Sequence, residues 1–145
     1  MAVCTFFGHR DVPDQVASRL RELLIYLIEK KGATHFLVGN QGKYDQMVLR
    51  ILISLQREYP DMKIEVVLAY LPRKPLSLGE AVSAFVPEAL ESVPPRFAID
   101  KRNRWMIDHS SFAVTYAWKP GGNAVNYKEI AIKKGLTIFE LSQEH

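Results

Sequence analysis

Three glycine-containing loops carry the residues whose types and spacing suit a phosphorylated ligand. The loops are Gly8–Arg10, Gly39–Asp45 and Lys119–Asn123, and each follows a run of residues typical of a β-strand. Glycine lets backbone amides approach a ligand closely, and the helix that follows such a loop presents partial positive charge at its N-terminus. These features favour phosphate as the bound group, with His9 and Arg10 as further hydrogen-bond donors.

The loops lack the longer motifs of two common phosphate-binding classes. The stretch Gly39–Gly42 is too short for a Walker loop, and Tyr44 stands where a Ser or Thr would bind magnesium. The first loop lacks the second glycine of the dinucleotide-binding fingerprint. We therefore expect neither ATP hydrolysis nor ordinary NAD binding.

Two charged residues have alternative roles that the sequence leaves open. The spacing of Arg102 from Ile99 and Met106 places it at the edge of an apolar helix face, where a cation needs a partner. A structural carboxylate and a ligand phosphate are equally suitable partners for the Arg102 cation. Asp45 opens the helix after the second loop, where a carboxylate either interacts with the helix dipole or contacts a ligand.

Other reactive residue types do not form a recognisable site. His35 and His109 have no second ligand-type residue at metal spacing, so we expect both to be structural. Cys4 is the single cysteine and lies in an apolar run, which indicates a buried, inert thiol. We expect no metal and no cofactor, and any catalysis would depend on carboxylates and arginine.

Five short runs rich in β-branched, aromatic and leucine residues predict the strands that position these loops. The runs are nearly continuous in apolar character, which is typical of parallel strands covered on both faces. The predicted strands are Val3–Phe7, His35–Val38, Ile64–Leu71, Phe112–Trp118 and Thr137–Leu141.

Segments with apolar residues at helical spacing alternate with these strands. The predicted helices are Pro13 to Gly32, Tyr44–Tyr59, Arg96–His109 and Asn126–Lys134. The alternation predicts right-handed crossovers and a three-layer α/β fold. In such folds ligands bind beyond the carboxyl ends of the strands, which is where the three glycine loops would meet.

The segment Pro72–Pro95 interrupts this alternation with several prolines. We interpret it as a long excursion with a short helix near Leu78–Phe85. Connections of this length in a compact domain are often lids or binding loops.

Length and composition are those of one globular domain, which we expect to span residues 1–145. Hydrophobic types make up 48% of the chain and charged types 24%. The net charge of +3 suits an anionic ligand without implying one. Neither a membrane-spanning run nor a signal-type N-terminus is visible, so we expect a cytoplasmic protein without membrane contact.

Four segments with a characteristic order occur along the chain: Cys4–Arg10, Val38–Gly42 followed by Asp45, Arg102–Asp108, and Gly121–Gly122. Together they resemble the SLOG superfamily, in particular its YpsA-like branch, over nearly the whole chain. The resemblance implies a Rossmann-like domain with strand order 3-2-1-4-5 that binds a nucleotide or an ADP-ribose-like ligand, often as a sensor. Relatives often self-associate, so a homo-oligomer is a further expectation.

The resemblance places the ligand in a crevice between the first and fourth strands. Glycine amides would contact phosphate, Arg10 and Arg102 would neutralise its charge, and Asp45 or Asn40 would bind a ribose hydroxyl. The expected ligand-binding residues are Gly8, His9, Arg10, Gly39, Asn40, Gly42, Asp45, Arg102, Gly121 and Gly122.

Two related families imply alternative functions. The Lonely Guy phosphoribohydrolases cleave a nucleoside monophosphate into base and ribose 5-phosphate, using an Arg that matches Arg102 and a Glu in a Pro-Gly-Gly-x-Gly-Thr-x-x-Glu motif. Here Lys128 occupies that Glu position, and Glu129 follows one residue later, a helical rotation of about 100 degrees. An enzyme of this class would therefore use Arg102 and Glu129. The DprA proteins, which bind single-stranded DNA, imply a third function, although the small, dispersed charge makes nucleic acid an unexpected partner.

Overall fold

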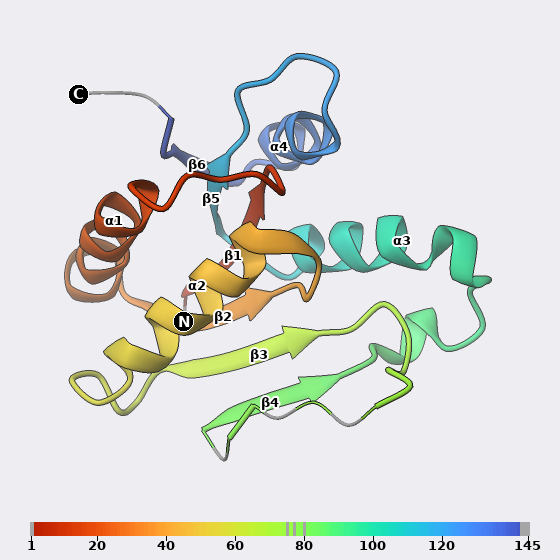
Figure 1. The fold of residues 1–145 in the computed structure, drawn as a ribbon, viewed down its shortest axis with the longest axis horizontal. Helices are drawn as coiled ribbons and strands as arrows, with labels where there is room; N and C mark the ends of the chain where they lie inside the picture. Colours follow the sequence, from red (N-terminus) through yellow and green to blue (C-terminus); the bar gives the residue numbers. More distant parts are fainter. Residues whose placement is uncertain (1, 75, 77, 80, 143–145) are drawn as a thin grey trace.

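The computed structural model describes residues 2–142, apart from residues 75, 77 and 80. All six strands formed by the described residues run parallel, in the order β4-β3-β2-β1-β5-β6 (Figure 1). Strand order reverses at β1, which pairs with β2 on one side and β5 on the other. The strands are β1 (Ala2–Gly8), β2 (Ala33–Val38), β3 (Lys63–Val67), β4 (Val82–Phe85), β5 (Phe112–Tyr116) and β6 (Thr137–Glu140).

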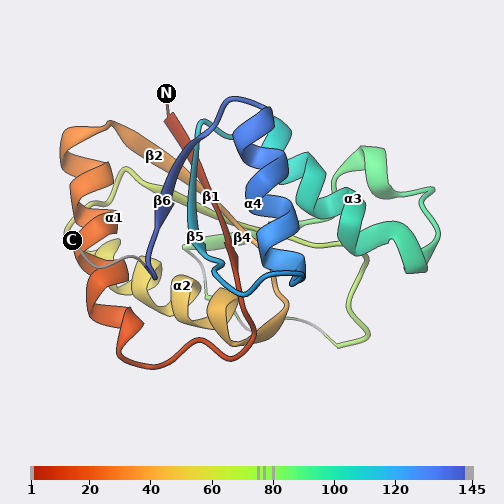
Figure 2. The same cartoon turned by 90° about the horizontal axis from the view of Figure 1, so that it is seen from above.

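Helices cover both faces of this sheet, as Figure 2 shows. One face carries α1 (Val16–Lys30) and α2 (Gly42–Leu55), and the other carries α3 (Pro95–Asp108) and α4 (Asn123–Lys133). A short 3-10 turn, η1 (Glu88–Leu90), precedes α3. The prediction of a three-layer α/β fold with a parallel sheet is confirmed. No helix in the described part of the chain is long and apolar enough to cross a membrane.

Successive residues of each central strand point into opposite layers, because side chains alternate along a β-strand. On β1, Cys4 and Phe6 pack into the core beneath α1 and α2, whereas Phe7 packs with Met106 of α3 and Ala131 of α4. This two-sided burial explains the nearly continuous apolar character of the strands. The Cys4 thiol is fully buried, as expected, and burial raises its pKa.

The sheet contains one strand more than the five predicted. The additional strand, β4, lies at the edge beside β3, and the five predicted strands keep their relative order. The expected helix near Leu78–Phe85 is therefore wrong, since Val82–Phe85 forms this strand; residue 80 lies outside the described residues. Pairing with β3 explains the difference, because it satisfies backbone groups along β3 and buries Val82.

Several elements are shorter, or begin elsewhere, than their sequence pattern predicts. At the carboxyl edge of the sheet, where ligands bind in parallel α/β folds, the β1–α1 loop is longer than predicted, whereas the β2–α2 and β5–α4 loops are shorter. The differences of two residues or more include the starts of α1 at Val16, β2 at Ala33, α2 at Gly42 and α4 at Asn123, and the ends of α2 at Leu55, β3 at Val67 and β5 at Tyr116.

Tyr44 of α2 packs its ring against Gly8 at the end of β1. The side chain is buried, and its hydroxyl donates a hydrogen bond to the carbonyl oxygen of Val114 at 2.9 Å. A Cβ atom at residue 8 would lie 2.4 Å from the ring, well inside van der Waals contact. The absence of a side chain at Gly8 therefore sets how closely α2 approaches the sheet.

Gly8→Ala should lower the free energy of unfolding by about 1–3 kcal/mol, the usual cost of overpacking a core. Urea denaturation of the wild-type protein and the variant measures this change. In a Tyr44→Ala background the obstructing Cγ and ring atoms are gone, so Gly8→Ala should cost less there. An equal cost in both backgrounds would show that the Tyr44 ring is not the obstacle.

Candidate functional site

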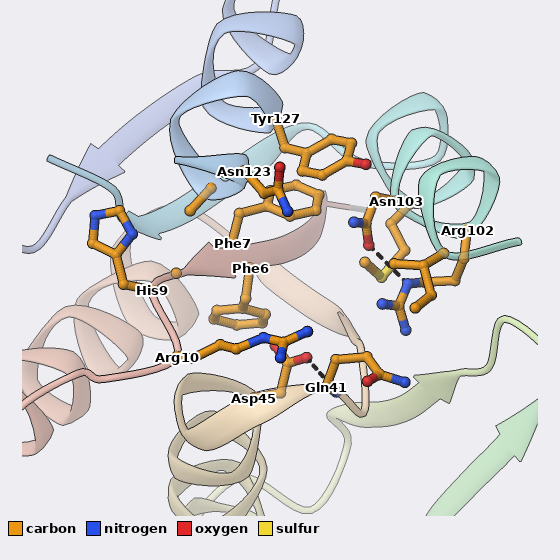
Figure 3. A pocket seen from close by; sticks show the side chains of 14 residues that line it. Phe6, Phe7, His9, Arg10, Gln41, Asp45, Arg102, Asn103, Asn123 and Tyr127 are labelled. Atoms are coloured by element: carbon orange, nitrogen blue, oxygen red, sulfur yellow. Dashed lines mark hydrogen bonds between the residues drawn. The ribbon is translucent and has the colours of Figure 1, made fainter. Parts of the chain in front are cut away.

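A pocket of about 300 Å³ lies at the carboxyl end of β1, where strand order reverses. Figure 3 shows Gln41 and Asp45 on its α2 side and Asn123 and Tyr127 on its α4 side. The first turns of both α2 and α4 thus border the pocket, so two helix N-termini contribute partial positive charge. A volume of this size is at the lower end of the range for small-molecule sites.

Arg102 of α3 supplies a buried positive charge to this pocket. Arg102 is 2% exposed, and it takes part in none of the ion pairs among the described residues. Nε donates to Oδ1 of Asn103 at 2.7 Å, and Nη1 donates to the Val67 carbonyl at 3.1 Å and to Oδ1 of Asn40 at 3.3 Å. These neutral acceptors orient the guanidinium group without cancelling its charge. Burial lowers the pKa of Arg102, and the negative charge of Asp45 opposes this effect.

Asp45 lines the same pocket, and Gly39 separates it from Arg102. Oδ2 of Asp45 accepts a hydrogen bond from the backbone N–H of Gln41 at 2.9 Å, so the carboxylate both satisfies the start of α2 and faces the pocket. Burial raises the pKa of Asp45 to about 6. A Cβ atom at Gly39 would lie 2.8 Å from Oδ2 of Asp45 and 3.0 Å from Nη1 of Arg102. Glycine at this position therefore makes room for both charged groups.

His9 lies in the pocket wall, but its imidazole already has two partners. Nε2 accepts hydrogen bonds from the backbone N–H groups of Trp118 and Lys119, each at 3.0 Å. Burial, assisted by the positive charge of Lys119, lowers the pKa of His9 below its ordinary value of 6.5. His9 thus holds the loop between β5 and α4, and Glu140 of β6 holds its other end by accepting from the Ala117 N–H at 3.1 Å.

Half of the predicted ligand-binding residues line the pocket, and the others lie beside it. The lining includes Gly8, His9, Arg10, Asp45 and Arg102. Asn40 binds Arg102 from outside the lining, Gly39 lies between Asp45 and Arg102, Gly42 lies against Arg10, and Gly122 faces His9. Gly121 is exposed in the loop between β5 and α4.

Sequence reasoning missed several residues of the lining. Asn123 and Tyr127 are four residues apart at the start of α4, a spacing that places both on one helix face and marks them as neighbours. Asn103 follows Arg102 directly and was not singled out. The missed lining residues are Phe6, Phe7, Gln41, Ile99, Asn103, Met106, Asn123, Ala124 and Tyr127.

Glu129 does not share this pocket with Arg102. It is exposed on α4 and borders a separate depression with Asp100 and Arg104. Two residues along a helix correspond to a rotation of about 200 degrees, so Glu129 points away from the face that carries Tyr127 into the pocket. The carboxylate that accompanies Arg102 is instead that of Asp45.

Comparison with solved structures finds the same fold in a larger protein. The X-ray structure of DNA processing protein A (DprA) from Streptococcus pneumoniae matches with a TM-score of 0.70 and 16% sequence identity. The match covers 97% of this chain and 50% of that chain, so the present chain spans half the length of this neighbour. At this identity the likeness shows the fold alone. No protein-family model and no curated protein sequence matches the chain.

Asp45 should reduce the stability of the fold when it is ionised. Its pKa rises from the ordinary value of 3.8 to about 6 on folding, so the folded state holds the additional proton between these values. Stability should therefore fall as pH rises through this window and stay level above it. Relative to the wild type, Asp45→Asn should gain about 2–3 kcal/mol of unfolding free energy between about pH 4 and pH 7.

Urea denaturation of both proteins in phosphate-free buffers across this pH range measures the difference. A difference in unfolding free energy that is the same at every pH would contradict the raised pKa of Asp45.

Proposed function

We propose that this pocket binds a nucleotide or a nucleotide-derived ligand, with phosphate against Arg102. The observation that carries the proposal is the buried guanidinium group with only neutral hydrogen-bond acceptors. A buried charge with no direct ion pair is costly, and phosphate forms strong charge-assisted hydrogen bonds with arginine. The N-termini of α2 and α4 favour negative charge at the same place.

The remainder of the pocket suits the other parts of a nucleotide. Phe7, Ile99, Met106 and Tyr127 form an apolar side, where Phe7 and Tyr127 stack with ring centroids 5.5 Å apart. A flat base would lie on this side, and Asp45 would accept a hydrogen bond from a ribose hydroxyl. Asn40 is less suited to the ribose because its amide oxygen already accepts from Arg102.

The proposal includes membership of the SLOG superfamily and its YpsA-like branch. Support comes from the four sequence segments described above and from the DprA-like fold, which covers 97% of the chain. On the same grounds we propose that residues 1–145 form one SLOG-like domain. Cleavage of the ligand is not part of the proposal, because Glu129 lies outside the pocket that contains Arg102.

A thermal-shift titration with AMP, ADP, ADP-ribose, NAD and cyclic nucleotides tests the proposal. A ligand at about 100 times its Kd should add about 2.7 kcal/mol to the free energy of unfolding, which a domain of this size shows as a higher Tm. Arg102→Ala should abolish the shift. Because Arg102 is buried, the exposed pocket residue Arg10 provides a second variant, and Arg10→Ala should weaken binding without disturbing the core.

Lys101→Ala serves as the matched control, since Lys101 is an exposed cation on the same helix as Arg102. The control should bind like the wild type. Equal losses in Lys101→Ala and Arg10→Ala would indicate a general charge effect, and the absence of a shift with every nucleotide would reject the proposal.

A second candidate function is single-stranded nucleic-acid binding, which exposed aromatic residues beside the pocket favour. Trp118 is 53% exposed and packs edge-on against His9, with ring centroids 5.9 Å apart. Tyr70 is 48% exposed and lies three residues after the end of β3, at the same edge of the sheet. Lys119 lies 5.5 Å from the Trp118 ring. Exposed aromatic rings beside cations are the usual platform for stacked bases, and the structural neighbour is a DNA processing protein.

Fluorescence anisotropy with a labelled single strand of about 16 nucleotides tests this candidate. Trp118→Ala and Tyr70→Ala should each weaken binding about 5- to 150-fold, because stacking contributes about 1–3 kcal/mol per base. Tyr26 of α1 is similarly exposed, so Tyr26→Ala is the matched control and should bind like the wild type. An affinity that none of these substitutions changes would contradict a stacking platform around the pocket.

A further inference from the structure

The loop between β5 and α4 carries the N-terminus of α4 to the pocket, and side chains from other elements hold it. His9 accepts from both Trp118 and Lys119, whereas Asp11 pairs with the Lys119 ammonium at 2.6 Å. Beyond these contacts the chain turns through Gly121 and Gly122 into Asn123, which lines the pocket. The position of this pocket wall therefore depends on His9 and Asp11 of the β1–α1 loop.

The two hydrogen bonds to His9 require one particular protonation state. Both N–H groups donate to Nε2, so this nitrogen must carry a lone pair and the neutral ring must carry its proton on Nδ1. Protonation of Nε2 would direct a third N–H at the two backbone N–H groups of Trp118 and Lys119. Both hydrogen bonds would then be lost together.

The groups around His9 favour the neutral ring at neutral pH. Burial is the largest effect and lowers the pKa of His9; the positive charge of Lys119 acts in the same direction, and the carboxylates of Asp11 and Glu140 oppose it. The rings of Tyr116 and Trp118 enclose the imidazole edge-on, at 5.8 and 5.9 Å. Protonation of His9 is therefore easier when the loop is released than when it is held. Acidification below pH 6.5, the ordinary pKa of histidine, should favour the released loop.

We infer that His9 is a positioning residue that makes the pocket sensitive to pH, since its unprotonated Nε2 holds the β5–α4 loop against the ligand site. The inference rests on the proposed function for its effect on ligand binding. Protonated His9 releases residues 118 and 119, the N-terminus of α4 loses its fixed position, and ligand affinity falls in mildly acidic solution. Glu140 continues to hold Ala117, so the release is confined to the part of the loop nearest the pocket.

Hydrogen exchange of the Trp118 and Lys119 amides, followed by NMR, tests the positioning role without any ligand. After correction for the intrinsic exchange rate, protection in the wild type should be lower at pH 5.5 than at pH 7.5 by up to about tenfold, the limit for a released imidazole that titrates at its ordinary pKa of 6.5. His9→Gln places an amide oxygen the same number of bonds from Cα as Nε2 and does not titrate, so protection should persist at both pH values. His109→Gln, at an exposed histidine, should behave like the wild type.

Protection in the wild type that does not change with pH would overturn the inference. Loss of protection in the wild type and in His9→Gln alike would also overturn it, because another group would then be responsible.

A second arm measures ligand binding with ADP-ribose, whose pyrophosphate gains no proton in this pH range. Asp45 also titrates there with the opposite effect, since its protonation removes a negative charge from the pocket, and an Asp45→Asn background eliminates this contribution. Calorimetry in that background should show weaker binding at pH 5.5 than at pH 7.5, by less than about tenfold. Adding His9→Gln should make the two affinities equal.

The two arms separate the inference from the proposed function. Failure of the wild-type protein to bind ADP-ribose or any nucleotide of the thermal-shift series at either pH would contradict the ligand proposal and the regulation derived from it, whereas the exchange experiment would still decide the positioning role of His9. Binding that weakens equally with and without His9→Gln would overturn the regulation alone.

Discussion

The Arg102 guanidinium group is buried and, among the described residues, donates its hydrogen bonds to neutral acceptors, which is the constraint on which the pocket depends. Its hydrogen-bond acceptors come from Val67 at the end of β3, from Asn40 after β2 and from Asn103 on α3. Three elements distant in sequence must therefore keep their relative positions for the charge to remain oriented. Because electrostatic interactions are stronger where water is scarce, a charge held in this way acts on whatever enters the pocket.

The opposite wall of the pocket is held by side chains of neighbouring elements. Glu140 of β6 is a buried carboxylate that accepts from the Ala117 backbone and from the Lys128 ammonium at 2.9 Å, while His9 after β1 holds the following residues. A loop that ends in two glycines has little conformational preference of its own. The strands on both sides of β5 therefore supply the order that the loop lacks.

Sequence patterns predict the sheet well because its central strands are buried on both faces, which leaves a nearly continuous apolar run. The same reasoning fails for β4, where Val82 is buried but Ser83 and Ala84 are exposed, and the strand exists because β3 offers a free edge. The meeting of the three glycine loops at one edge also follows from parallel topology. The sequence predicts that Gly8 contacts phosphate. The packing of the Tyr44 ring against residue 8 already requires glycine there, because a Cβ atom would overlap the ring.

The pocket is harder to predict, since its composition depends on where α4 begins. A start at Asn123 instead of Asn126 places Asn123 and Ala124 in the first turn of the helix, where both line the pocket. A sequence pattern shows the period of a helix but does not place the first turn after a glycine loop. Asn103 is also hard to predict as a pocket residue. It orients Arg102 by accepting a hydrogen bond, and the residue type alone does not indicate this contact.

Residue 128 is a position at which this chain departs from the phosphoribohydrolase pattern. Cleavage of an N-glycosidic bond through an oxocarbenium-like state needs a carboxylate held near the sugar. The resemblance to the phosphoribohydrolases places that carboxylate at position 128, where this chain has Lys. The Lys128 ammonium instead pairs with Glu140, in the cluster that holds the β5–α4 loop. The position thus serves to fix the pocket wall, and Asp45, near Arg102 at the start of α2, is the carboxylate that lines the pocket among the described residues.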